Sequence, residues 1–92
     1  MKLGTYTKQP TERESYTISY AEDLTAGDNV KTATAEVTPA GLTVENVAVT
    51  SPRVRFWVSG GAVNVTYKVT VTTETEDNRV LVDEVIIKIK DY

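Results

Sequence analysis

Residues 63–72 read Val-Asn-Val-Thr-Tyr-Lys-Val-Thr-Val-Thr, and this stretch decides the fold class. Every second residue from Val63 to Val71 is apolar or aromatic, and the residues between them are polar. Successive side chains of a β-strand point to opposite faces, so this alternation is typical of a strand with one buried and one solvated face. The Gly60-Gly61 pair just before it is the sharpest turn signal in the chain. The stretch therefore predicts a strand that follows a tight turn.

The same pattern extends over the rest of the chain, in which Val, Ile and Thr make up more than a third of the 92 residues. These residues pack well on pleated sheets, and turn signals recur at the spacing of a β-sandwich. We therefore expect an all-β fold, a single immunoglobulin-like β-sandwich of about seven antiparallel strands. A change of alternation near Glu45-Asn46 predicts a bend or a bulge, and Asp83 interrupts a second apolar phase in a way that indicates another bulge. The expected strands are 5–9, 14–21, 30–38, 42–49, 53–59, 63–72 and 79–90.

The length fits one domain over residues 1–92. Residues 1–11 are polar and contain no core-forming run, so we expect this segment to be either loose or an arm that adds a strand to a neighbouring subunit's sheet. Ala33 and Ala35 share one strand face, and such small residues indicate the close approach of a bulky side chain, for which Trp57 is a candidate.

The composition removes most catalytic and metal chemistry. The chain has no cysteine and no histidine, so it lacks thiolate ligands, imidazole ligands and the usual general base near neutral pH. Carboxylates gather at two turns, but neither turn has the spacing of a calcium loop, and solvated loop carboxylates are the better interpretation. We therefore expect no catalytic, metal-binding or cofactor-binding residue and no enzyme activity. The residues at these turns are Glu22, Asp23 and Asp28, and Glu74, Glu76 and Asp77.

Charge and hydropathy limit the partners. The net charge is -3, and the positive charges form no basic stripe, so we expect no nucleic-acid partner. No apolar run is long enough to span a membrane, and the N-terminus has no signal-peptide pattern. The protein is therefore expected to be made in the cytoplasm and to have no membrane partner.

Three residues of the expected strand 53–59 form a candidate protein interface. If Val54, Phe56 and Val58 face inward, then Arg53, Arg55 and Trp57 face outward together. An exposed Trp beside Arg residues is typical of an interface hot spot. The sequence leaves open whether Trp57 lies in the core or in this interface.

A string of motifs along nearly the whole chain resembles a known family. It runs from Lys8-Gln9-Pro10 through Thr38-Pro39-Ala40-Gly41-Leu42 to Val58-Ser59-Gly60-Gly61, Tyr67, Arg79 and Ile87-Lys88-Ile89. This string is similar to the small immunoglobulin-like virion proteins of tailed bacteriophages, of the fiber–tail adaptor type. A Gly-bearing turn usually precedes the Arg in that family, whereas this chain has Glu76-Asp77-Asn78.

The resemblance implies a non-enzymatic virion protein, made in the host cytoplasm. Such a protein would attach a fiber or an accessory protein to the tail or neck. Its partners would be other phage virion proteins in a symmetric ring. Two alternatives remain open at this point. One is a capsid decoration or cement protein. The other is a carbohydrate-binding module for the host surface, in which Trp57 and Tyr side chains would stack on sugars.

Overall fold

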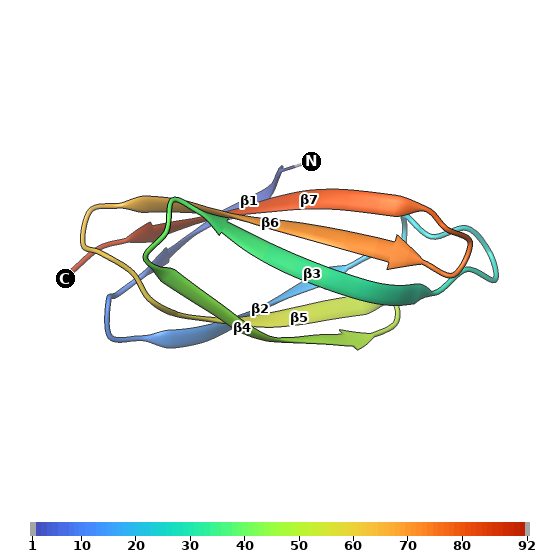
Figure 1. Ribbon diagram of the computed structural model, residues 1–92, viewed down its shortest axis with the longest axis horizontal. Coiled ribbons are helices and arrows are strands. Elements are labelled where there is room, and N and C mark those ends of the chain that lie inside the picture. The colour runs from blue at the N-terminus through green and yellow to red at the C-terminus, as the bar shows by residue number, and fades with distance from the viewer. Residues whose placement is uncertain (1, 92) are drawn as a thin grey trace.

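The computed structural model describes residues 2–91, with side chains from Gly4 onward, and contains seven β-strands in two layers (Figure 1). One sheet has the order β1-β7-β6-β3 and the other the order β2-β5-β4. The layers form an elongated sandwich with extents of 45 × 20 × 19 Å. The strands are β1 (Lys2–Lys8), β2 (Arg13–Ser19), β3 (Val30–Thr38), β4 (Leu42–Thr50), β5 (Arg53–Gly60), β6 (Thr66–Thr75) and β7 (Val80–Ile89).

The strand order is that of an immunoglobulin domain. If β2 to β7 are taken as strands B to G, the sheets contain B-E-D and C-F-G, the two sheets of a constant-type domain. This arrangement confirms the predicted immunoglobulin-like sandwich. The expectation of antiparallel strands throughout is wrong for β1, which runs parallel to β7. Alternation of apolar and polar residues is the same in parallel and antiparallel strands, so it carries no information on this direction.

The core lies between the sheets and is filled by alternate residues of the central strands. Val54, Phe56 and Val58 of β5 are fully buried, and Tyr67 and Val69 of β6 face them from the other layer. Buried polar residues continue this phase at the end of β6, at Thr73 and Thr75. The remaining members of the buried apolar core are Ile18, Tyr20, Val30, Leu42, Val71, Val85, Ile87 and Ile89.

The strand predicted for residues 63–72 starts later and ends later than expected. Val63 lies in a turn and is 45% exposed, because Asn64 adopts a left-handed φ of 66° and β6 begins only at Thr66. At the other end, β6 continues to Thr75. The apolar alternation thus predicted the strand and its buried face correctly. The left-handed conformation of Asn64 determines where the strand begins.

A hydrogen bond to the Tyr67 hydroxyl fixes the connection between the sheets at the start of β6. The backbone N–H of Ala62 donates to the Tyr67 hydroxyl at 2.9 Å. A tyrosine at this place, bonded to backbone a few residues upstream, is a hallmark of immunoglobulin-like domains. Gly41 lies against the same hydroxyl, since a Cβ at Gly41 would stand 2.9 Å from it. The ring therefore also restricts what can occupy the β3–β4 connection.

Of the two expected irregularities, one is present and one is not. The β4–β5 register shifts between Glu45 and Ala48, and Asn46 has a φ of 52°, which confirms the predicted bulge. The bulge expected at Asp83 is absent, because β7 pairs with β6 in unbroken register. Asp83 instead points inward and is 2% exposed. Asp83 can occupy an inward position of β7, among apolar residues, because the buried Tyr20 supplies a hydrogen-bond partner.

Candidate functional site

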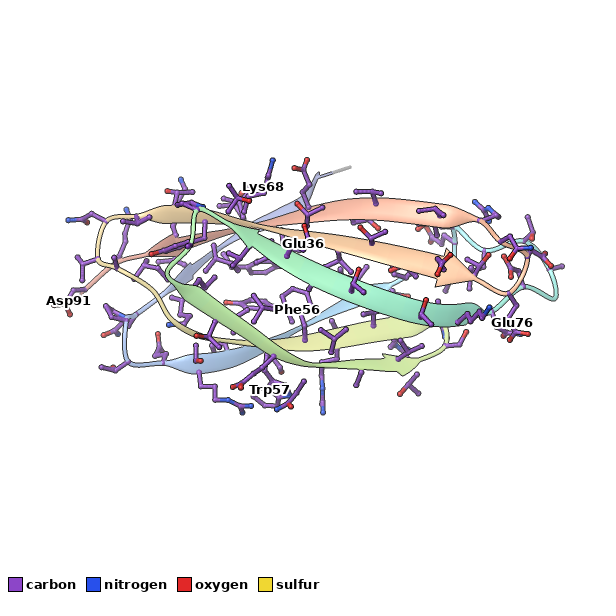
Figure 2. All side chains as sticks on the ribbon, viewed as in Figure 1. Glu36, Phe56, Trp57, Lys68, Glu76 and Asp91 are labelled. Carbon is purple, nitrogen blue, oxygen red and sulfur yellow. The ribbon has the colours of Figure 1, made fainter. Side chains whose placement is uncertain are left out.

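The candidate site is the outer face of the β2-β5-β4 sheet, which we call the arginine face and define by Arg13, Glu45, Arg53, Arg55 and Trp57. β5 is the central strand of this sheet, and its alternation sends Val54, Phe56 and Val58 inward. Their neighbours Arg53, Arg55 and Trp57 therefore project from the opposite face. Figure 2 shows this directly, with Phe56 between the layers and Trp57 on the outside of the lower sheet.

This placement answers the question that the sequence left open for Trp57. The indole is half-buried and lies outside the sandwich, so it does not belong to the core. The idea that Trp57 fills the space over Ala33 and Ala35 is wrong for the same reason. Those alanines lie on β3, whose partly buried face packs against the core between the sheets.

Two guanidinium groups cover the Trp57 ring. Arg13 lies with its guanidinium carbon 4.2 Å from the ring centroid, and Arg55 lies at 5.4 Å. Both distances are within the range of cation–π attraction, which is worth about 0.5–1 kcal/mol at exposed sites. Arg13 also donates through Nε to Glu45 at 3.2 Å, and both side chains of this pair are 44% exposed. An ion pair so exposed contributes about 0–1 kcal/mol, so these contacts hold the cluster together only weakly.

Sequence reasoning did not find Arg13 or Glu45. They come from different strands, and only the register of β5 with β2 and β4 brings them to Trp57. Glu45 stands directly opposite Trp57, while Arg13 is opposite Ser59 and reaches the indole along the sheet. Residues 13, 15, 17 and 19 are polar, and this alternation indicated that they face outward. It did not indicate which strand pairs with β2.

Small residues beside the arginines leave a shallow hollow of ≈ 280 Å³. The residues that line it are Thr17, Ala48, Thr50, Arg53 and Arg55. Each guanidinium can bind a carboxylate through two parallel hydrogen bonds, and the hydroxyls beside them can donate as well. The hollow is therefore suited to receive an acidic side chain.

The arginine face is positive although the chain as a whole is acidic. It carries three arginines and one glutamate, against a net charge of -3 for the chain. Electrostatic attraction of this kind steers association and selects partners more than it adds affinity. The face therefore favours a partner surface that bears carboxylates.

The acidic residues at the expected turns do not form a metal site among the residues that the structure describes. Asp28 is buried, and its Oδ1 accepts hydrogen bonds from the backbone N–H groups of Asn29 and Asp77 at 2.9 and 3.0 Å. Burial opposes ionisation, but the Thr75 side chain and these N–H groups outweigh it and lower the pKa of Asp28. Through Oδ1, this carboxylate holds two connections together.

Lys8 is another charged group with a structural role. It is 1% exposed, and its Nζ donates to the carbonyl oxygens of Gln9 and Gly60, both at 2.7 Å. Burial lowers the pKa of Lys8, and the nearby carboxylates of Glu12 and Glu14 act in the opposite direction. The bond to Gly60 connects the end of β1 to the end of β5, so Lys8 ties the two sheets together at one end.

No helix in residues 2–91 is long and apolar enough to cross a membrane. A family model described as podophage GP4 fiber-tail adaptor protein gp77 matches residues 8–88. The matched range includes β2 to β6 in full and most of β7. No curated protein matches the chain.

Proposed function

The chain belongs to the podophage GP4 fiber-tail adaptor family, and from this premise we propose that it attaches a fiber or an accessory protein to the tail or neck of the virion. Family membership makes it a structural adaptor protein of a bacteriophage and a component of the virion. We propose further that it has no enzyme activity, that it is made in the host cytoplasm, and that it acts as one module over residues 1–92.

The observation that carries the proposal is the arginine face. Trp57, Arg13 and Arg55 form an aromatic and cationic cluster on the outer face of the β2-β5-β4 sheet, in which the arginines are exposed and the indole is half-buried. Trp and Arg are the residues most enriched among interface hot spots. We propose that this face, with Arg53, Arg55 and Trp57 at its centre, docks on an acidic surface of another virion protein.

The same cluster argues against a sugar-binding module. Stacking on a sugar needs an open aromatic ring, whereas the Arg13 guanidinium already lies over the indole at 4.2 Å. Protein partners suit this arrangement better, because their carboxylates can bind the two arginines while the indole packs beside them.

The copy number in purified virions separates an adaptor from a capsid decoration protein. We propose that the partners form a symmetric ring, so quantitative mass spectrometry should find a copy number set by that ring, on the order of a dozen or fewer per particle. Hundreds of copies would instead indicate a decoration protein. Absence of the chain from virions would overturn the adaptor function.

A matched pair of charge reversals tests the docking face. Arg55→Glu should reduce incorporation into virions strongly, because it places a carboxylate against the acidic partner. Lys88→Glu changes the net charge by the same amount on the outer face of the other sheet and should be incorporated like the wild type. Equal incorporation of both variants, with both folded by circular dichroism, would show that the arginine face is not the docking surface.

A further inference from the structure

The two sheets present four edge strands among the residues that the structure describes, and three of them are irregular. Edge strands offer unpaired backbone groups, and proteins usually protect them with bulges, charges or covering segments. β1 shifts register between Lys2 and Gly4, β3 between Val30 and Thr32, and β4 between Glu45 and Ala48. The β3 and β4 edges are also close to each other on one side of the sandwich. These three edges are poor templates for an added strand.

β2 is the exception. Its seven residues pair with β5 one by one, from Arg13 opposite Ser59 to Ser19 opposite Arg53, with no shift of register. The strand has no proline, glycine or lysine, and Ser15 to Ser19 carry no charge. β5 lies on one side of β2, and no strand within residues 2–91 pairs with β2 on the other side. An edge with an unbroken register and an uncharged stretch of five residues is suited to β-strand addition.

Aromatic rings from β1 and β2 lie beside this edge. Tyr6 of β1 contacts Tyr16 of β2, with ring centroids 4.8 Å apart, and Tyr16 continues to Phe56 at 5.8 Å. The Tyr6 side chain is 44% exposed. A strand added to β2 would place every second side chain on the face of Tyr16, and thus next to these rings. Apolar side chains fit there.

We propose that the free edge of β2 accepts an extended segment of a partner virion protein as a fourth strand of the β2-β5-β4 sheet. The segment alternates apolar residues, which lie against Tyr6 and Tyr16, with acidic residues, which lie beside Arg13 on the arginine face. The backbone would supply the affinity and the alternating side chains the specificity. This inference rests on the proposed adaptor function, and it specifies that one partner binds through an extended segment.

Charge argues for a different protein and against a second copy of this chain. Two copies joined edge to edge through β2 would align their arginine faces on one continuous sheet, each with three arginines and one glutamate. Like charges brought together in this way oppose association. The chain's own β1 is equally unsuited as the added strand, because it already pairs with β7.

Amide hydrogen exchange tests the inference on the intact protein. Residues 13–19 should exchange at least about tenfold more slowly in purified virions than in the isolated chain, because the outward N–H groups of β2 acquire partners. Residues 42–50 of β4, at the other edge of the same sheet, are the internal control and should change little. Docking through side chains alone would leave both edges unchanged, and a uniform slowing of both would reflect general rigidity. Either result would overturn the inference.

Proline substitutions at two neighbouring positions give a second test. Neighbouring N–H groups of a strand point to opposite sides, so one of Glu14→Pro and Ser15→Pro removes an outward N–H and leaves the bonds to β5 intact. The variant that keeps its thermal stability should be lost from virions. Wild-type incorporation of that variant would contradict strand addition while leaving the adaptor function in place. If neither variant folds, the exchange measurement decides, and absence of the wild-type chain from virions overturns both proposals.

Discussion

Tyr20 connects the two sheets of the sandwich through its hydroxyl group. It follows directly after β2 in the sequence, is 1% exposed, and accepts a hydrogen bond from Thr73 Oγ1 of β6 at 3.0 Å. The hydroxyl is also hydrogen bonded to the Asp83 carboxyl group of β7. Burial, reinforced by Asp83, raises the pKa of Tyr20, so the phenol stays protonated and can donate. The carboxylate can remain in the core because this donor is present.

We expect Tyr20→Phe to lower the free energy of unfolding by about 1–3 kcal/mol, because it leaves the buried Asp83 and Thr73 without this partner. Urea titration followed by circular dichroism measures the change. Tyr6→Phe removes a hydroxyl from a 44% exposed ring and should change the stability by less than about 0.5 kcal/mol. Equal stabilities of the wild type and Tyr20→Phe would mean that water replaces the phenol at Asp83.

Asp83 also shows where sequence reasoning stops at the level of single residues. Its position in the apolar phase of β7 was visible, but the partner that makes an inward carboxylate acceptable comes from a segment 63 residues earlier, at Tyr20. A polar residue in an apolar phase was therefore interpreted as a bulge. Arg53, Arg55 and Trp57 were predictable as one face of a single strand. The position of Arg13 beside Trp57 was not, because it depends on the register between β2 and β5.

At the level of whole elements, the strands were predictable and their pairing was not. Alternation gave the buried faces of β5 and β6 and the bulge in β4, because burial on one face imposes a period of two. No local sequence pattern indicates that β1 runs parallel to β7, or that β2 pairs with β5 without a shift of register. Both depend on which strand lies next to which, and this follows from the packing of the complete sandwich.

Asp28 joins two connections that lie far apart in the sequence. It precedes β3, and it accepts the N–H of Asp77 in the turn between β6 and β7. The backbone strengthens this contact, because Glu76 N–H donates to Asn29 O at 2.9 Å. Since hydrogen bonds hold the pKa of Asp28 below its ordinary value, the folded state binds this proton more weakly than the unfolded state does.

This pKa shift predicts a pH dependence with a definite sign. The stabilisation by ionised Asp28 is fully present above the unfolded pKa, about 3.9, and is lost as the pH falls through the lower folded pKa. Asp28→Asn cannot ionise, so its stability deficit relative to the wild type should be largest above that pH and shrink in more acidic solution. Urea titrations of both proteins at several pH values measure this difference. A deficit that is independent of pH would show that the contact does not depend on the charge.

At the level of the whole molecule, the distribution of charge separates one face from the rest. The chain has a net charge of -3, yet the arginine face carries three arginines and one glutamate, so the remainder is more acidic than the total suggests. An acidic partner therefore attracts one side of the domain and repels the others. This asymmetry orients the domain before contact, which suits a small adaptor that must be placed in one orientation.

Association through the arginine face should depend on the salt concentration. Purified protein, added to particles assembled without it, should bind more slowly as the ionic strength rises, because screening shortens the Debye length from about 10 Å at 0.1 M to about 3 Å at 1 M. The loss should fall mainly on the association rate, since steering acts before contact. Arg53→Gln combined with Arg55→Gln should bind slowly at every ionic strength and lose most of the salt dependence, whereas Lys88→Gln should keep it. Rebinding that is equally fast at low and high salt would show that apolar contact around Trp57, and not the arginines, selects the partner.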